Sequence, residues 1–151
     1  MTASDFIAKW KGGGKERQNA QEFFIDLCRL FRHPTPREAD AEGTSFAFEY
    51  GADKTGGRKG WADAWKRGFF GWEAKGTHKD LNEAYKQLKM YADALQNPPL
   101  LVVSDLQSII VHTNFTNSVK KEHRIEVADL EDPEKRRVLE AMFHDPERLR
   151  P

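Results

Sequence analysis

The stretch of residues 61–91 constrains the fold more than any other part of the chain. Residues 61–65 and 69–75 are rich in aromatic side chains and bounded by glycine, which is typical of β-strands. The short connection between them contains Gly68, which tolerates the left-handed backbone of a tight turn, so the two segments are expected to form a hairpin. Apolar side chains at helical spacing follow from Leu81 to Leu95 and predict an amphipathic helix that ends at Asn97-Pro98-Pro99.

The hairpin brings two carboxylates to one side of the sheet. Because side chains alternate along a strand, Asp63, Glu73 and Lys75 are predicted to share one face. In the simplest register Gly71 lies opposite Asp63 and leaves open space beside it. Asp63 and Glu73 are then diagonal neighbours, roughly 7–8 Å apart at the backbone.

Two carboxylates at that reach can share a hard cation such as Mg²⁺, which prefers oxygen ligands. A divalent ion polarises a phosphoryl oxygen and lowers the pKa of a bound water, and a nearby ammonium such as Lys75 stabilises developing charge. The pattern therefore indicates phosphodiester hydrolysis. A solvated strand face carrying an aspartate and a Glu-Lys pair explains the same residues about equally well.

The order of these residues resembles the PD-(D/E)XK nuclease superfamily. Within it, the chain is similar to the N-terminal nuclease domain of MmeI-like (type IIL) restriction–modification enzymes. Ala62 stands where the superfamily label has proline. The residues that carry the resemblance are Asp63, Glu73-Ala74-Lys75, Lys79-Asp80-Leu81, Ala84-Tyr85, Gln87, Tyr91, the 16–31 segment and Phe48-Glu49.

The resemblance implies that Asp63, Glu73 and the backbone carbonyl of Ala74 bind Mg²⁺, for which Mn²⁺ can substitute. Lys75 would then serve the attacking water. Gln87, on the following helix, is implied as a further catalytic group and Tyr91 as a DNA contact. The extra acid that some members supply from the first helix would be Glu16, with Glu22 and Glu49 as competing candidates.

Charge is unevenly distributed along a chain whose formal net charge is zero. Residues 54–79 contain seven basic residues and two acids, which suits a polyanion. An ordinary solvated loop explains the glycine-rich part of this segment equally well. The neutral total indicates that another domain assists DNA binding. The candidate DNA contacts in this strip are Lys54, Arg58, Lys59 and Lys79.

The expected partners follow from the resemblance. They are double-stranded DNA and a fused or associated DNA methyltransferase with a target-recognition domain, of which only the methyltransferase would use S-adenosylmethionine. A dimer is one route to cutting both strands. Two alternatives stay open: a non-catalytic module that docks DNA or a partner on the same fold, and a standalone nuclease for RNA or branched DNA.

The elements predict an α/β chain with a restriction-endonuclease-like fold, in which helices flank a central mixed β-sheet. Residues 1–130 are expected to form the nuclease-like domain, and residues 131–151 a C-terminal helix and the start of a linker to a downstream domain. The expected order is two helices, three strands, a helix, two or three strands and a terminal helix. Residues 33–44 are expected to be a polar loop, and residues 106–111 a strand.

Cys28 is the single cysteine, so no disulfide framework or zinc cluster is available. It falls on an apolar helical stripe and is expected in the core. The sequence shows no signal peptide and no apolar run of membrane length. A cytoplasmic location is therefore expected.

Overall fold

The computed structural model describes the chain except for residues 13–15, 55, 57–59 and 77–79. The described strands form one sheet in the order β1-β2-β3-β4-β5-β6. Strands β3 and β4 are parallel, whereas the other neighbouring pairs are antiparallel. The strands are β1 (Phe46–Tyr50), β2 (Ala62–Lys66), β3 (Phe70–Ala74), β4 (Leu100–Ser104), β5 (Ser108–Thr113) and β6 (Glu122–Glu126).

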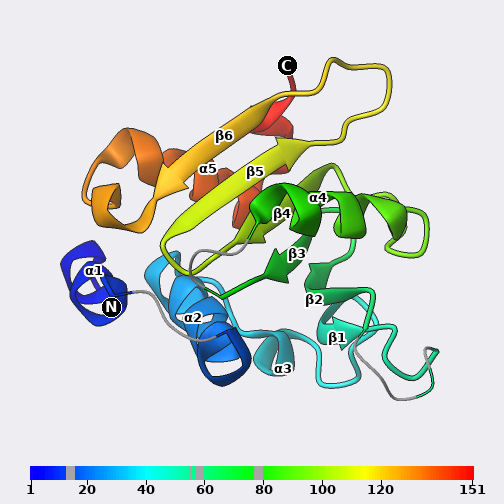
Figure 1. Ribbon diagram of the computed structural model, residues 1–151, viewed down its shortest axis with the longest axis horizontal. Helices are drawn as coiled ribbons and strands as arrows, with labels where there is room; N and C mark the ends of the chain where they lie inside the picture. The colour runs from blue at the N-terminus through cyan, green and yellow to red at the C-terminus, as the bar shows by residue number, and fades with distance from the viewer. Residues whose placement is uncertain (13–15, 55, 57–59, 77–79) are drawn as a thin grey trace.

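Helices cover both faces of this sheet (Figure 1). On one face α1, α2 and α5 pack against Ala64, Phe70 and Trp72. On the other face α4 packs against Trp65, Leu101 and Val103. The fold is thus α/β with a mixed sheet flanked by helices, as predicted, and it is consistent with a restriction-endonuclease-like fold. The helices are α1 (Ala3–Trp10), α2 (Glu16–Leu30), α3 (Pro36–Ala39), α4 (Leu81–Met90) and α5 (Pro133–His144), with 3₁₀ turns at Val127–Asp129 and Pro146–Leu149.

Aromatic side chains make up the centre of the larger core. The ring of Phe24, from α2, lies within contact range of Phe46 from β1 and of Phe70 and Trp72 from β3. It also meets Phe143 from α5, with ring centroids 5.9 Å apart. The C-terminal helix therefore shares the core of the sheet and α2. The expected burial of Cys28 in this core is confirmed.

The β2–β3 hairpin forms as predicted, but in a different register. Trp65 pairs with Gly71 and Lys66 with Phe70, so the connection comprises residues 67–69. The expected register was two residues out, because Phe69 lies in the turn and donates its N–H to the Lys66 carbonyl at 3.0 Å. A shift of two residues preserves the alternation of side chains, so the face assigned to Asp63 is unaffected.

Gly71 has a different role from the one expected. It lies opposite Trp65, not Asp63. A Cβ at this position would stand 2.9 Å from the Leu95 Cδ1 atom and 3.5 Å from that of Leu88. The missing side chain therefore lets α4 and the turns after it pack closely on the sheet, and does not open space for a metal.

Three further boundaries differ from expectation. Residues 36–39 form the short helix α3 inside the segment expected to be a loop, because Glu38 accepts the Thr35 N–H in a capping box. Strand β5 begins at Ser108, later than expected, because Asp105 accepts the N–H groups of Gln107 and Ser108 and keeps residues 106 and 107 in a bend before the strand. Helix α4 ends at Met90, and residues 91–96 form turns.

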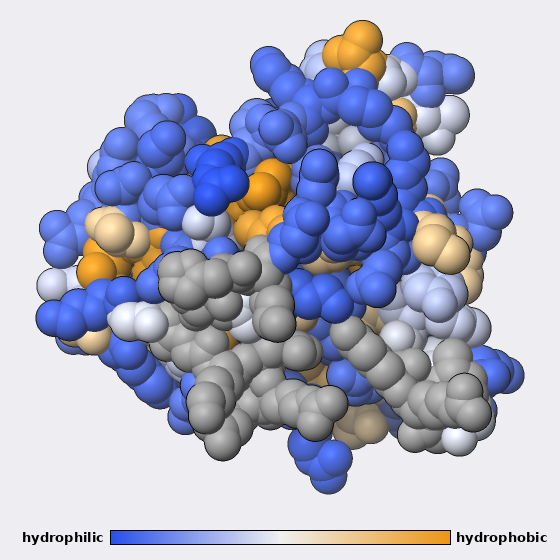
Figure 2. Space-filling model, viewed as in Figure 1, coloured by the Kyte–Doolittle hydropathy of each residue, from blue (hydrophilic) through white to orange (hydrophobic). Residues whose placement is uncertain are grey.

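The surface in Figure 2 is largely hydrophilic, in agreement with the mean hydropathy of −0.76. No helix among the described residues is both long and apolar enough to cross a membrane.

Lys66 ties the end of β2 to the C-terminal helix on the α2–α5 face of the sheet. Its Nζ donates to the Phe143 carbonyl at 2.8 Å and lies 2.9 Å from His33 Nε2. It also lies 3.6 Å from the centre of the Phe69 ring. Burial lowers the pKa of Lys66 from 10.5 to about 8, since the charged ammonium is partly removed from water.

Replacement of Lys66 by methionine should therefore flatten the alkaline stability profile. Because the pKa is lower in the folded protein than in the unfolded chain, wild-type stability should rise between the pKa of about 8 and the usual 10.5. The rise relative to Lys66→Met should be about 2 kcal/mol, since the half-solvated ammonium experiences only part of an apolar environment. Urea unfolding across this range measures it, with exposed Lys89→Met as control. Parallel wild-type and Lys66→Met curves would contradict the account.

Candidate functional site

The two residues that carry the predicted carboxylates lie where the β2–β3 ladder ends. The backbone pairing extends to Ala64 and Trp72, and one further step in the same register places Asp63 directly opposite Glu73. Directly opposed residues lie closer than the diagonal neighbours expected from sequence, about 4.5–5.5 Å between Cβ atoms. The observed register therefore brings Asp63 and Glu73 closer together than the predicted register did.

A hydrogen bond fixes the position of Asp63. Its Oδ2 atom accepts the backbone N–H of Ala74 at 2.7 Å. Within an antiparallel ladder the N–H and C=O of a residue point to the same side of the strand. The Ala74 carbonyl therefore faces β2, the side on which Asp63 lies, which is the orientation its predicted role requires.

Glu73 and Lys75 form the second half of the arrangement. The Glu73 side chain is only 6% exposed, and its Oε2 lies 3.5 Å from the Lys75 Nζ. Lys75 also donates to the Gln87 Oε1 at 3.1 Å. Because β3 ends at Ala74, Lys75 leaves the sheet here and reaches across to α4. The ammonium is therefore held between a strand carboxylate and a helix amide.

Glu73, Lys75 and Gln87 line a cavity of about 310 Å³ between the residues that precede β2, the end of β3 and the C-terminal half of α4, whereas Asp63 is not among its lining residues. Gln87 and Tyr91 both line it, one helical turn apart, as the predicted helix placed them. The other four lining residues, Gly60, Trp61, Leu88 and Met90, were not predicted as part of the site. Trp61 was assigned to the hairpin strand only, and the signal that could have singled it out was its place directly before the alternating strand.

The donor set suits a hard divalent cation. Two carboxylates and a peptide carbonyl are oxygen ligands, and Mg²⁺ usually binds through one or two carboxylates while keeping several waters. No group of three or more histidine, cysteine, aspartate or glutamate side chains that could hold a metal occurs among the described residues. The arrangement is therefore a carboxylate pair with room for water, not a closed cage.

The described candidates for an additional acid lie in different parts of the structure. Glu22 lies 3.6 Å from Lys9 Nζ, where α1 meets α2. Glu49 accepts the N–H of Gly60 at 2.8 Å, so it braces a residue that lines the site cavity. The side chain of Glu16 lies outside the described part of the chain. Of the two described candidates, Glu49 is the one tied to the site.

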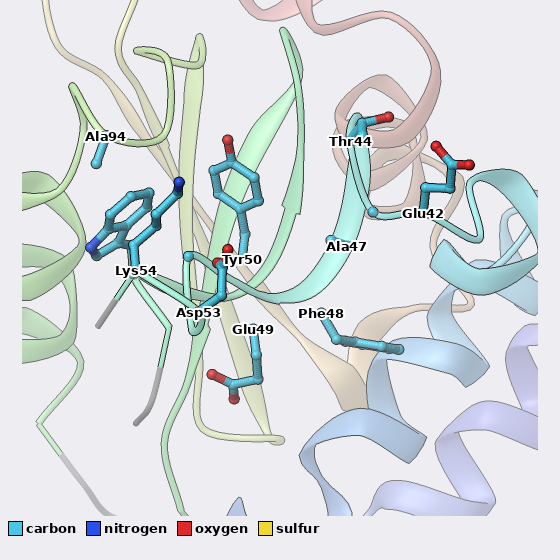
Figure 3. A pocket seen from close by; sticks show the side chains of 12 residues that line it. Glu42, Thr44, Ala47, Phe48, Glu49, Tyr50, Asp53, Lys54 and Ala94 are labelled. Atoms are coloured by element: carbon cyan, nitrogen blue, oxygen red, sulfur yellow. The ribbon is translucent and has the colours of Figure 1, made fainter. Parts of the chain in front are cut away.

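Only some of the residues predicted to contact DNA lie in the described part of the chain. Lys54 is exposed and lines a neighbouring cavity of about 640 Å³. Figure 3 shows Lys54 and Tyr50 toward one end of this cavity and Glu42 and Thr44 toward the other. Arg58, Lys59 and Lys79 lie outside the described residues. Lys66 belongs to the basic strip in sequence, yet it reaches Phe143 on the α2–α5 side.

A family model for the N-terminal domain of MmeI matches residues 1–148. The chain belongs to the family of the MmeI N-terminal domain. The match covers both strands of the hairpin, α4 and the C-terminal helix. Membership supports a module related to restriction enzymes. No match was found among curated proteins, and none among solved structures.

Two substitutions at Asp63 should separate its structural role from its charge. Asp63→Asn retains an oxygen that can accept the Ala74 N–H, so its unfolding free energy should stay close to that of the wild type. Asp63→Ala leaves this donor without the bond and should cost about 1–2 kcal/mol. Urea denaturation measures both, with the exposed Asp93→Ala as control. Equal stability of the two Asp63 variants would contradict the hydrogen bond's role.

Proposed function

We propose that this chain is a Mg²⁺-dependent endodeoxyribonuclease module that hydrolyses DNA phosphodiester bonds. One observation carries the proposal: Asp63, Glu73 and Lys75 converge at the end of a buried strand, beside an open cavity. Family membership supports a setting in a restriction–modification or phage-defence protein.

The carboxylates of Asp63 and Glu73 and the carbonyl of Ala74 are the groups that would hold the metal. When bound there, Mg²⁺ or Mn²⁺ would polarise the scissile phosphate and lower the pKa of a water molecule. The Asp63 carboxylate is pre-positioned by the Ala74 N–H, and the Glu73 carboxylate by its buried strand. Both acids are therefore in place before DNA arrives, which reduces the reorganisation required during the reaction.

Lys75 is the group that orients the attacking water and stabilises charge on the phosphate. Its ammonium lies next to Glu73, so it remains close to the oxygens that would hold the metal. The Gln87 oxygen accepts a hydrogen bond from the Lys75 ammonium and keeps this flexible side chain directed into the cavity. Gln87 therefore acts by positioning Lys75, and Tyr91 stands at the rim where DNA enters.

The substrate proposed for this site is double-stranded DNA. The described part of the chain offers few basic groups around the cavity, so sustained DNA binding requires another domain. A DNA methyltransferase that uses S-adenosylmethionine, together with a target-recognition domain, would supply both affinity and sequence choice. Pairing of two such modules would cut both strands.

Lys75→Met should lower Mg²⁺-dependent plasmid cleavage by about a hundredfold or more, because it removes a charge that acts on the reacting phosphate. Lys86→Met is the matched control, since Lys86 is an exposed lysine on α4 that pairs with Glu83 at 3.5 Å. The rate of plasmid nicking, measured with each variant at equal concentration, tests the assignment. Cleavage by Lys75→Met at the wild-type rate would overturn the role of this lysine.

A further inference from the structure

The cavity of the candidate site has an apolar side that the hydrolytic groups do not use. Trp61, Met90 and Tyr91 line it together with Glu73, Lys75 and Gln87. We call Trp61, Met90 and Tyr91 the apolar wall. Met90 is 77% exposed and Tyr91 is 41% exposed, and they are two of only four large hydrophobic residues recorded as exposed in the described chain. Neither is needed for metal binding or proton transfer.

The position of Trp61 in the apolar wall is fixed by its packing against Gly51 and Tyr50. A Cβ on Gly51 would clash with the Trp61 ring, so this glycine permits close packing of the indole. The Tyr50 ring meets Trp61 edge-on at 5.8 Å and stacks on Trp65 at 3.7 Å. Trp61 is thus anchored through Tyr50 to the buried face of the sheet, while its indole still borders the cavity.

The adjoining cavity limits where a DNA backbone can run. Trp61 also lines this larger space, whose charged lining residues are Glu42, Glu49, Asp53 and Lys54. Three acids and one base repel a phosphate backbone. The DNA strand is therefore expected on the Lys75 and Gln87 side, with Trp61 at the border between the two cavities.

We propose that the apolar wall takes the nucleobase next to the scissile phosphate after that base has left the helical stack. This inference rests on the proposed nuclease function and adds a nucleotide subsite to the same cavity. Aromatic and apolar side chains that contact an unstacked base contribute sequence-tolerant affinity, and apolar side chains that enter a base step open the duplex. A cavity of about 310 Å³ has the size of a small ligand site.

The direct test compares binding of a short fluorescein-labelled oligothymidylate with binding of the same sugar-phosphate backbone carrying abasic residues. Fluorescence anisotropy in EDTA excludes any contribution from a metal. The wild type should bind the base-containing strand about fivefold to tenfold more tightly. Trp61→Ala should abolish the difference, Trp61→Phe should retain most of it, and Met90→Ala should reduce it.

Val119→Ala is the control, because Val119 is 73% exposed and does not line the cavity. Thermal unfolding identifies any variant that fails to fold, and Met90→Ala keeps the test valid if Trp61→Ala is one of them, since Met90 is largely solvent-exposed. Three results would overturn the inference: no saturable binding of the wild type to either strand, equal binding to both, or a preference that survives both Trp61→Ala and Met90→Ala.

Failure of this inference and failure of the nuclease proposal give different results. Asp63→Asn should keep the base preference in EDTA, because Asp63 does not belong to the apolar wall. A chain that cleaves DNA through Lys75 but shows no base preference would retain the nuclease proposal and lose the subsite. Conversely, a base preference without metal binding would indicate a nucleic-acid docking module.

Discussion

The candidate site depends on one hydrogen bond, from the Ala74 N–H to the Asp63 carboxylate. This bond forms just beyond the last backbone pair of β2 and β3, where the Ala74 N–H bonds to a side chain. The end of the ladder therefore sets the position of the Asp63 carboxylate. The same step along β3 presents Glu73, the Ala74 carbonyl and then Lys75 in succession. Strand geometry therefore delivers two acids, a carbonyl and an ammonium to one place without long loops.

The α4 helix completes the site because it is packed closely on the strands. Gly71 allows Leu88 of α4 and Leu95 of the turns that follow to approach β3, and α4 presents Gln87 to Lys75. Core packing and the proposed chemistry are thus coupled through one helix. On the opposite face, Lys66 and the aromatic cluster around Phe24 attach α5 to the sheet. Two described basic residues of the 54–79 segment, Lys66 and Lys75, consequently reach helices on opposite faces of the sheet.

Much of this arrangement could be predicted from the sequence. Alternation in the strands placed Asp63 and Glu73 on the same face, and helical spacing placed Gln87 and Tyr91 on one flank of α4. The register of β2 against β3 could not be predicted. Phe69 can end the turn or begin the strand, and its tertiary contacts decide between the two. Periodicity also gave no means of finding Trp61 or Met90. Their role depends on which surfaces remain uncovered after packing, and a linear pattern contains no such information.

Calorimetric titration of Mn²⁺ or Mg²⁺ into the wild type and Asp63→Asn is the sharpest test of a metal site at Asp63 and Glu73, because it does not depend on DNA targeting. We expect saturable binding by the wild type, with or without a short DNA duplex that can complete the metal ligands. This binding should be lost in Asp63→Asn, which should remain as stable as the wild type. Absence of wild-type binding even with the duplex present, or undiminished binding by Asp63→Asn, would contradict a metal site at Asp63 and Glu73.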